Sequence, residues 1–375
     1  MPTFIRTQVY EQLDETMKIL AIDIGAGTQD IILYDTEKEV ENSLLMIMPS
    51  PTVVIAGRIH AAQSRKKGIL LKGSLMGGGP STKAIKQHIK QGLEVYATPD
   101  AALTINDDLE KVKEIGIRII RDDEINPGTL EEIVLQDVDM QAIGNALAGF
   151  GVKMPDMVAV AVQDHGNSPD LSNRVYRFRI FERIISEGGE AKRFAYSQGT
   201  IPADLTRMRS AAHTLGEKGV VFMDTGPAAI FGALFDPAAM QPSLVVNIGN
   251  GHTLAAIVKD DRVRALYEHH TSSLTGEKLQ EQIILFADGR LSFDDVFNEG
   301  GHGCYVKETD GFDAIRSVMI TGPRLNILKN MHPDNKDRRL WEKLHFATPF
   351  GNMMLSGCYG LLASYLQQEQ ARSHI

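Results

Sequence analysis

Apolar residues along this chain gather in short runs that are separated by polar turns and by segments of helical spacing. The first run, 18–24, is continuous and rich in β-branched residues, which predicts a buried strand. A glycine-rich turn follows, and a second strand is expected at once over 30–35, with a third over 43–48. A strand that returns directly after the glycines predicts a hairpin and not a strand that feeds a helix.

The middle of the chain is less regular. We expect a strand over 69–76, a helix over 81–91, a helix near 129–149 and a strand over 157–163. The stretch 174–184 alternates basic and apolar residues, as an exposed-faced strand or a short helix does.

The second half begins the strand pattern again. Strands are expected over 219–223, 243–248, 254–259, 261–268 and 317–321. Helices are expected over 227–234, 274–287 and 350–366.

Two segments, 18–35 and 243–260, match each other in pattern. Each has an apolar strand, a polar residue just before an Ile-Gly pair, a glycine turn with a threonine, and an apolar return strand. Asp23 in the first copy corresponds to Asn247 in the second. The copies start far further apart than the period of about 20–50 residues of a solenoid, so the repeat predicts two similar domains that face each other.

Glycine turns of this kind suit phosphate binding. Glycine lets the backbone N–H groups approach an anion without a Cβ in the way. Asp23 could hold Mg²⁺, directly or through water, because Mg²⁺ prefers oxygen ligands and keeps several waters. Two facing turns would clamp the phosphates of a nucleotide from both sides. The alternative, a tight turn without a ligand, is weakened by the second copy. A P-loop motif is absent, and a Rossmann motif would need a helix after the glycines.

These motifs resemble those of the actin, Hsp70 and sugar-kinase (ASKHA) superfamily of ATP-binding proteins. Residues 23–30 look like its first phosphate motif, 247–253 like its second, and 223–234 like its connecting motif. Residues 318–328 are similar to its adenosine motif, with Pro323 in place of a second glycine. The resemblance implies an α/β fold of duplicated ribonuclease H-like domains, with mixed sheets flanked by helices and a nucleotide cleft between them.

The same resemblance implies a domain plan. It consists of an N-terminal extension over 1–17, a first actin-like ATPase domain over 18–242 with an insertion at about 50–155, and a second over 243–375. The implied cofactors are ATP and Mg²⁺, with Asp23 as the metal-binding residue. Translation from Met17 instead of Met1 is the alternative for the extension.

Asp23 and Asp224 are the catalytic residues that the resemblance implies, because sugar kinases carry a catalytic aspartate in the connecting motif. The alternative for Asp224 is an N-cap of the following helix. Asn247 keeps hydrogen bonding but lacks the charge that many members have there, which weighs against hydrolysis more than against binding. The residues expected to bind the nucleotide are Gly25, Ala26, Gly27, Thr28, Gln29, Asn247, Gly249, Asn250, Gly251, His252, Thr253, Thr321 and Gly322.

Other polar groups are weaker candidates. Asp164 and His165 follow a central strand, where α/β sheets place ligands, and are expected on the substrate side. Residues 77–83 could form an anion loop at a helix N-terminus, although a plain loop is the favoured reading. The four arginines of 174–184 could recognise an anion, but we expect them on a solvated edge; they are Arg174, Arg177, Arg179 and Arg183.

Composition narrows the partners. The net charge of −9 argues against nucleic-acid binding. No run approaches the roughly 18 apolar residues of a membrane span, and the N-terminus lacks the apolar segment of a signal peptide. Two cysteines fit a reducing cytoplasm and exclude a disulfide scaffold. A homodimer is left open.

The whole chain is also similar to a family whose members are sometimes labelled pyruvate formate-lyase activating enzymes. That radical chemistry needs an iron–sulfur cluster held by three cysteines. This chain has only Cys304 and Cys358, which we expect to be inert thiols. The leading expectation is therefore ATP-dependent phosphotransfer or ATP hydrolysis, with an acceptor, small molecule or protein, that the sequence does not identify. The alternative is a nucleotide-gated binding or activator protein with little turnover.

Overall fold

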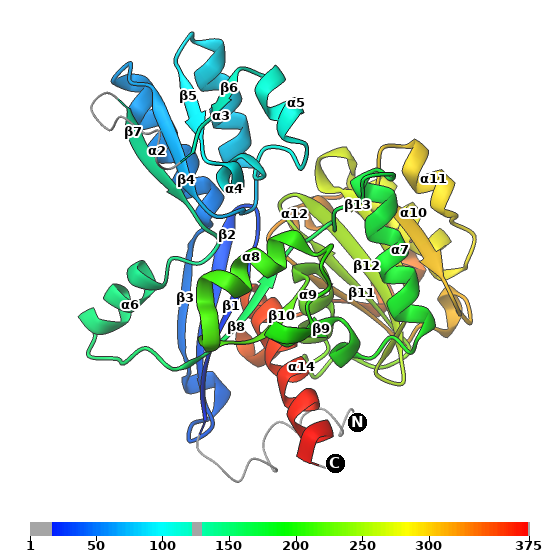
Figure 1. Ribbon diagram of the computed structural model, residues 1–375. Coiled ribbons are helices and arrows are strands. Elements are labelled where there is room, and N and C mark those ends of the chain that lie inside the picture. Colours follow the sequence, from blue (N-terminus) through cyan, green and yellow to red (C-terminus); the bar gives the residue numbers. More distant parts are fainter. Residues whose placement is uncertain (1–16, 122–129, 374–375) are drawn as a thin grey trace.

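The computed structural model describes residues 17–121 and 130–373 (Figure 1). Within these residues, the strands form two six-stranded sheets and one four-stranded sheet. The predicted extension, 1–17, lies outside the described residues except for Met17.

The first sheet begins with an antiparallel meander, β3–β2–β1, and continues with β8 and β10 parallel to β1. Residues of β1 and β8 are almost wholly buried, because helices cover both faces of this part of the sheet. In spatial order the strands are β3 (Leu44–Pro49), β2 (Thr28–Asp35), β1 (Lys18–Ile24), β8 (Met157–Val162), β10 (Gly219–Met223) and β9 (Ala195–Tyr196).

The second sheet repeats this plan. An antiparallel meander, β13–β12–β11, is followed by β15 and β16, both parallel to β11. In spatial order its strands are β14 (Gly303–Val306), β13 (Arg262–His270), β12 (His252–Lys259), β11 (Ser243–Ile248), β15 (Ser317–Thr321) and β16 (Leu344–Phe346). Five strands thus correspond in order and direction between the two sheets. The predicted fold, duplicated ribonuclease H-like domains of the actin type, is confirmed.

The predicted insertion holds a smaller unit with its own apolar core. Its parallel sheet runs in the order β6 (Ile117–Ile119), β5 (Val95–Ala97), β4 (Ile69–Gly73) and β7 (Glu131–Leu135). Its helices are α2 (Pro51–Ser64), α3 (Pro80–Lys90), α4 (Pro99–Ala102) and α5 (Leu109–Glu114). Figure 1 shows this unit, in blue and cyan, as a separate lobe above the first sheet.

Some sequence-based predictions of elements are wrong. The predicted helix near 129–149 is helical only as α6 (Met140–Gly149), because β7 occupies Glu131–Leu135 and pairs with β4. The predicted strand 69–76 ends at Gly73, whose φ of +96° turns the chain. Of the two alternatives for 174–184, the strand is wrong and the helix is present, because the stretch lies within one long helix, α7 (Asn173–Ser186), capped by Ser172.

The remaining helices cover the two large sheets. They are α8 (Thr206–Leu215), α9 (Thr225–Ala233), α10 (Gly276–Ala287), α11 (Phe293–Asn298), α12 (Asn326–Lys329), α13 (Arg338–Lys343) and α14 (Ser356–Ser373). None of the helices in the described part of the chain is both long enough and apolar enough to cross a membrane.

Helices α9 and α14 cross at close range under the first sheet. A Cβ on Gly232 of α9 would overlap the carbonyl group of Ser356, and one on Gly360 of α14 would overlap that of Ala228. Glycine at these two positions therefore lets the helix backbones approach each other.

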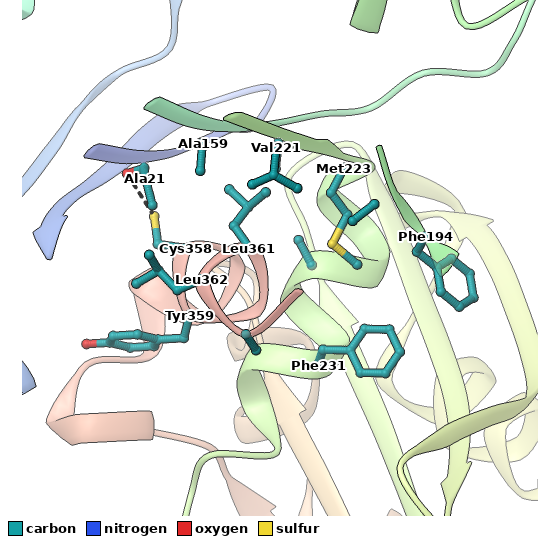
Figure 2. Packing of buried hydrophobic residues seen from close by; sticks show 14 of the residues in the cluster. Ala21, Ala159, Phe194, Val221, Met223, Phe231, Cys358, Tyr359, Leu361 and Leu362 are labelled. Atoms are coloured by element: carbon teal, nitrogen blue, oxygen red, sulfur yellow. Dashed lines mark hydrogen bonds between the residues drawn. The ribbon is translucent and has the colours of Figure 1, made fainter. Parts of the chain in front are cut away.

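The packing of α14 ties the end of the second predicted domain to the first sheet. Figure 2 shows its side chains, Cys358 and Leu361 among them, directed toward the strands that carry Ala21, Ala159 and Val221. The thiol of Cys358 donates to the carbonyl oxygen of Ala21 over 3.5 Å. The predicted second domain, 243–375, thus contributes a helix to the core of the first.

Candidate functional site

The two glycine turns of the repeat meet at the centre of the molecule. A Cβ on Gly27 would overlap the side chain of Asn250, and a Cβ on Gly251 would lie 3.8 Å from that of Ala26. The facing arrangement that the repeat predicts is thus present. In this conformation the turns touch and separate two cavities.

A pair of buried carboxylates lies beside the first turn. Asp23 and Asp30 are register partners across β1 and β2, and each is less than 10% exposed. Burial raises the pKa of Asp23 to about 7, opposed by the hydroxyl of Thr225, which donates to Asp23. Burial and the charge of Asp23 raise the pKa of Asp30 to about 8, and within the described residues Asp30 Oδ1 accepts no hydrogen bond. The carboxyl groups of Asp23 and Asp30 receive few hydrogen bonds, and their oxygens are ligands of the kind that Mg²⁺ prefers.

The smaller cavity, about 70 Å³, brings together predicted residues from both turns and from the end of β15. These residues are Asp23, Gly25, Ala26, Thr28, Asn247, Gly249, Asn250, Thr321 and Gly322. Two other predicted residues point elsewhere: Gln29 donates to the carbonyl of Pro49, and buried Thr253 pairs with Thr271. Ligand pockets usually measure about 300–1,000 Å³, so a nucleotide requires the turns to separate.

The larger cavity, about 480 Å³, lies on the other side of the turns. Both turns, the insertion segment 76–79 and the predicted substrate-side residues Asp164 and His165 line it. The wall of this cavity therefore contains residues from both six-stranded sheets' turns and from the insertion. Its volume suits a small molecule or a side chain of a partner.

Arg177 of α7 lies under this cavity and is 2% exposed. Its Nη1 and Nη2 donate to Asp224 over 2.7 and 2.9 Å, and its Nε donates to Glu268 over 2.6 Å. Burial disfavours the charge, but the two ion pairs outweigh it and raise the pKa of Arg177. The predicted solvated edge is wrong for this arginine, although Arg179 on the same helix is exposed.

Asp224 is the N-cap of α9, the alternative that its sequence position left open. Its side chain accepts from the backbone N–H of Gly226 and of Asp164, both over 3.0 Å, as well as from Arg177. Both of its oxygens are therefore engaged in this conformation.

Sequence reasoning missed several groups at the site. Asp30 lies at the end of the segment 23–30, and Glu268 lies on β13, but neither was singled out as a neighbour of Asp23 or Arg177. His302 approaches the second turn from before β14, and His270 ends β13 beside it. Their proximity depends on sheet pairing, which a single sequence does not display.

The cysteines lie in different elements, Cys304 in β14 and Cys358 in α14, and both are buried. Burial raises the pKa of Cys304 to about 12 and also raises that of Cys358. Both thiols donate to backbone carbonyl groups, as expected of inert core residues.

Residues 76–327 match the model of a family described as "Putative pyruvate format-lyase activating enzyme (DUF1786)". None of the curated proteins matches the sequence. Among solved structures, the ethanolamine utilization protein EutJ from Carboxydothermus hydrogenoformans is similar with 12% identity and a TM-score of 0.29 over 97% of this chain and 95% of that one.

Two further structures show similar values. The activator of 2-hydroxyisocaproyl-CoA dehydratase from Clostridium difficile, with bound ADPNP, has 8% identity and a TM-score of 0.31 over 96% of this chain and 98% of its own. A ROK family glucokinase from Streptomyces griseus, in complex with glucose and AMPPNP, has 8% identity and a TM-score of 0.33 over 94% and 100%. Scores this low carry no functional argument, and the fold assignment rests on strand order.

Proposed function

This chain belongs to the family whose model matches residues 76–327, and we propose that it is an ATP–Mg²⁺-binding phosphotransferase or ATPase. The observation that supports this function best is the meeting of two glycine turns beside the buried pair Asp23 and Asp30. The acceptor, whose identity stays open, would occupy the larger cavity on the far side of the turns.

The chain's own groups suit this task. Backbone N–H groups of the turns would hold phosphate oxygens, and ionised Asp23 and Asp30 would hold the cation. Bound Mg²⁺ neutralises phosphate charge, which is much of what phosphoryl transfer requires. A cation would also remove the cost of ionising two adjacent buried carboxyls.

Radical activation of another enzyme, which the family description suggests, does not suit this chain. An iron–sulfur cluster of that type needs at least about three thiolates in one place. Cys304 and Cys358 lie in separate elements, and each is held as a neutral thiol in the core.

A nucleotide-gated switch with little turnover is the second candidate, and two observations favour it. Asp224, one of the expected catalytic residues, already accepts hydrogen bonds from Arg177 and two backbone amides. Asn247 carries no charge at the second turn. In this reading ATP closes the molecule on a partner, and hydrolysis is slow.

Calorimetric titration with Mg-ATP tests the binding that both candidates share. The chain should bind one nucleotide, and a hundredfold excess over Kd should stabilise the fold by about 2.7 kcal/mol. Asp23→Asn should weaken the Mg²⁺-dependent part of binding, whereas Asp204→Asn, outside both cavities, should not. Wild-type chain that shows neither heat nor a melting shift with millimolar Mg-ATP would contradict the proposal.

Phosphate release separates the two candidates. For an enzyme, Asp224→Asn should lower turnover per folded molecule by about 10²–10⁴-fold while ATP still binds. For a switch, the same substitution should lower stability, because it removes the charge that pairs with buried Arg177, and should leave the slow phosphate release unchanged.

A further inference from the structure

Three histidines from distant parts of the chain converge on the floor of the larger cavity. His165 follows β8, His252 opens β12 at the second glycine turn, and His302 immediately precedes β14. Each offers one ring nitrogen, and these atoms all lie within 4.8 Å of one another. The ring centroids are 4.6 to 5.8 Å apart.

His302 has no evident structural role for its polar atoms. Its side chain is 1% exposed, and neither ring nitrogen has a hydrogen-bond partner among the described residues. Nδ1 lies 3.8 Å from Glu268 Oε2, which is too long for a hydrogen bond. Leaving a buried polar atom unpaired costs free energy, so an unpartnered imidazole that faces two others indicates a ligand.

We propose that His165, His252 and His302 bind one divalent transition-metal ion of the Zn²⁺ type. Imidazole suits Zn²⁺, Cu²⁺, Fe²⁺ and Ni²⁺, whereas Mg²⁺ and Ca²⁺ prefer oxygen. Three protein ligands leave a coordination position open, as in metal sites that act on a substrate. Because His165 and His252 line the larger cavity, that open position faces the space where an acceptor would lie.

The surroundings favour a cation at this place. The carboxylate of Glu268 is buried beside the histidines, with Oε2 3.8 Å from His302 Nδ1, and its negative charge favours a cation there. The amide nitrogen of Gln163 lies 2.8 Å from His252 Nδ1 and donates to Glu268 over 3.1 Å.

This ion is distinct from the Mg²⁺ proposed above. Asp23 and Asp30 line the smaller cavity, and the three histidines lie across the touching turns from them. His252 belongs to the second turn itself, so a metal held there would fix one wall of the nucleotide cleft. The inference does not depend on ATP binding.

Metal titration of the purified, chelator-treated chain tests the site. The wild-type chain should bind one Zn²⁺ at micromolar concentrations, and Co²⁺ should give visible absorption bands that Zn²⁺ abolishes and excess Mg²⁺ does not. Loss of an outer partner alone costs about 10–100-fold in affinity, so His302→Asn and His165→Asn should each cost at least about a hundredfold.

A neighbouring buried histidine supplies the matched control. His269 precedes His270 on β13, is fully buried, and points to the opposite face of that strand from Glu268. His269→Asn should retain Zn²⁺ affinity. Circular dichroism checks that each variant is folded. If His302→Asn does not fold, His165→Asn, which changes a half-buried side chain, still tests the site. The proposal is overturned if the wild-type chain takes up no Zn²⁺, or if folded His165→Asn binds it as tightly as the wild type.

Discussion

Arg177 joins elements of both large sheets through two buried ion pairs. Asp224 follows β10 in the first sheet, and Glu268 lies on β13 in the second. Removing one partner of a buried ion pair typically costs about 3–5 kcal/mol. Arg177→Met should therefore lower the free energy of unfolding in urea by about that amount.

Arg179 lies on the same helix but is exposed, so Arg179→Met is the matched control for Arg177→Met. Arg179→Met should change the free energy of unfolding by less than about 0.5 kcal/mol. Equal losses in the two variants would show that the buried ion pairs do not hold the domains together.

His88 of α3 gives the insertion a dependence on pH. Burial lowers the pKa of His88 below its ordinary value of 6.5; the backbone of Lys67 opposes this shift, and His60 adds to it. The unfolded chain takes up this proton near that value and the folded chain does not. Stability is therefore full above about pH 6.5 and is lost as the pH falls below it.

Urea unfolding of His88→Gln at several pH values between about 7 and 5 checks this. The free energy of unfolding should fall less steeply with acid than in the wild type. His213→Gln, which changes an exposed histidine of α8, should leave the slope unaltered. Parallel slopes for wild type and His88→Gln would contradict the assignment.

At the scale of elements, the crossing of α9 and α14 makes a sharp prediction. Gly232→Ala places a methyl group against the carbonyl of Ser356. Overpacking typically costs about 1–3 kcal/mol, which exceeds the gain of up to about 1 kcal/mol from the better helix propensity of alanine. The urea midpoint should fall.

Gly57 of α2 offers the opposite case, because a Cβ there would meet nothing within 4 Å. Gly57→Ala should raise stability by about 0.5–1 kcal/mol. If Gly232→Ala raised the urea midpoint as Gly57→Ala does, α9 and α14 would not approach each other closely at Gly232.

Elements with a clear period were predictable, and those with a mixed pattern were not. The predicted strands 219–223 and 317–321 coincide with β10 and β15, because each has an apolar, β-branched centre and is bounded by turn residues. The stretch 174–184 misled because its arginines alternate with apolar residues, as in a strand. Arg177 is buried there only because acidic partners arrive from two other elements.

At the scale of the whole molecule, the repeat predicted the two sheets and the facing turns. The sequence could not show how closely the turns meet, nor which residues of the insertion line the larger cavity, because both depend on how domains pack. The histidine cluster was equally hidden, since His165 and His302 come together only when both sheets have formed.

Because the two glycine turns touch, a disulfide between them can test whether ATP binding requires the turns to separate. The Cβ of Ala26 and a Cβ on Gly251 would be 3.8 Å apart, close to the mean of about 3.8 Å in disulfides. Ala26→Cys with Gly251→Cys should form a disulfide on oxidation and lock the turns together. The oxidised protein should lose Mg-ATP binding, as calorimetry measures, because the smaller cavity of about 70 Å³ cannot then enlarge.

Reduction with dithiothreitol should restore that binding, and Ala26→Cys alone should bind ATP under both conditions. Undiminished binding by the fully oxidised double variant would mean that the nucleotide enters without separation of the turns.

The packing of α14 against the first sheet affects how this protein folds while it is being translated. Strands β1 to β3 leave the exit tunnel early, but the helix that covers their sheet is translated only after the whole second sheet. The apolar face that carries Ala21, Ala159 and Val221 therefore lacks this cover until α14 has been translated. Exposed surface of this kind favours aggregation of incomplete chains. The nascent protein should consequently need chaperone protection until translation has passed Ser356.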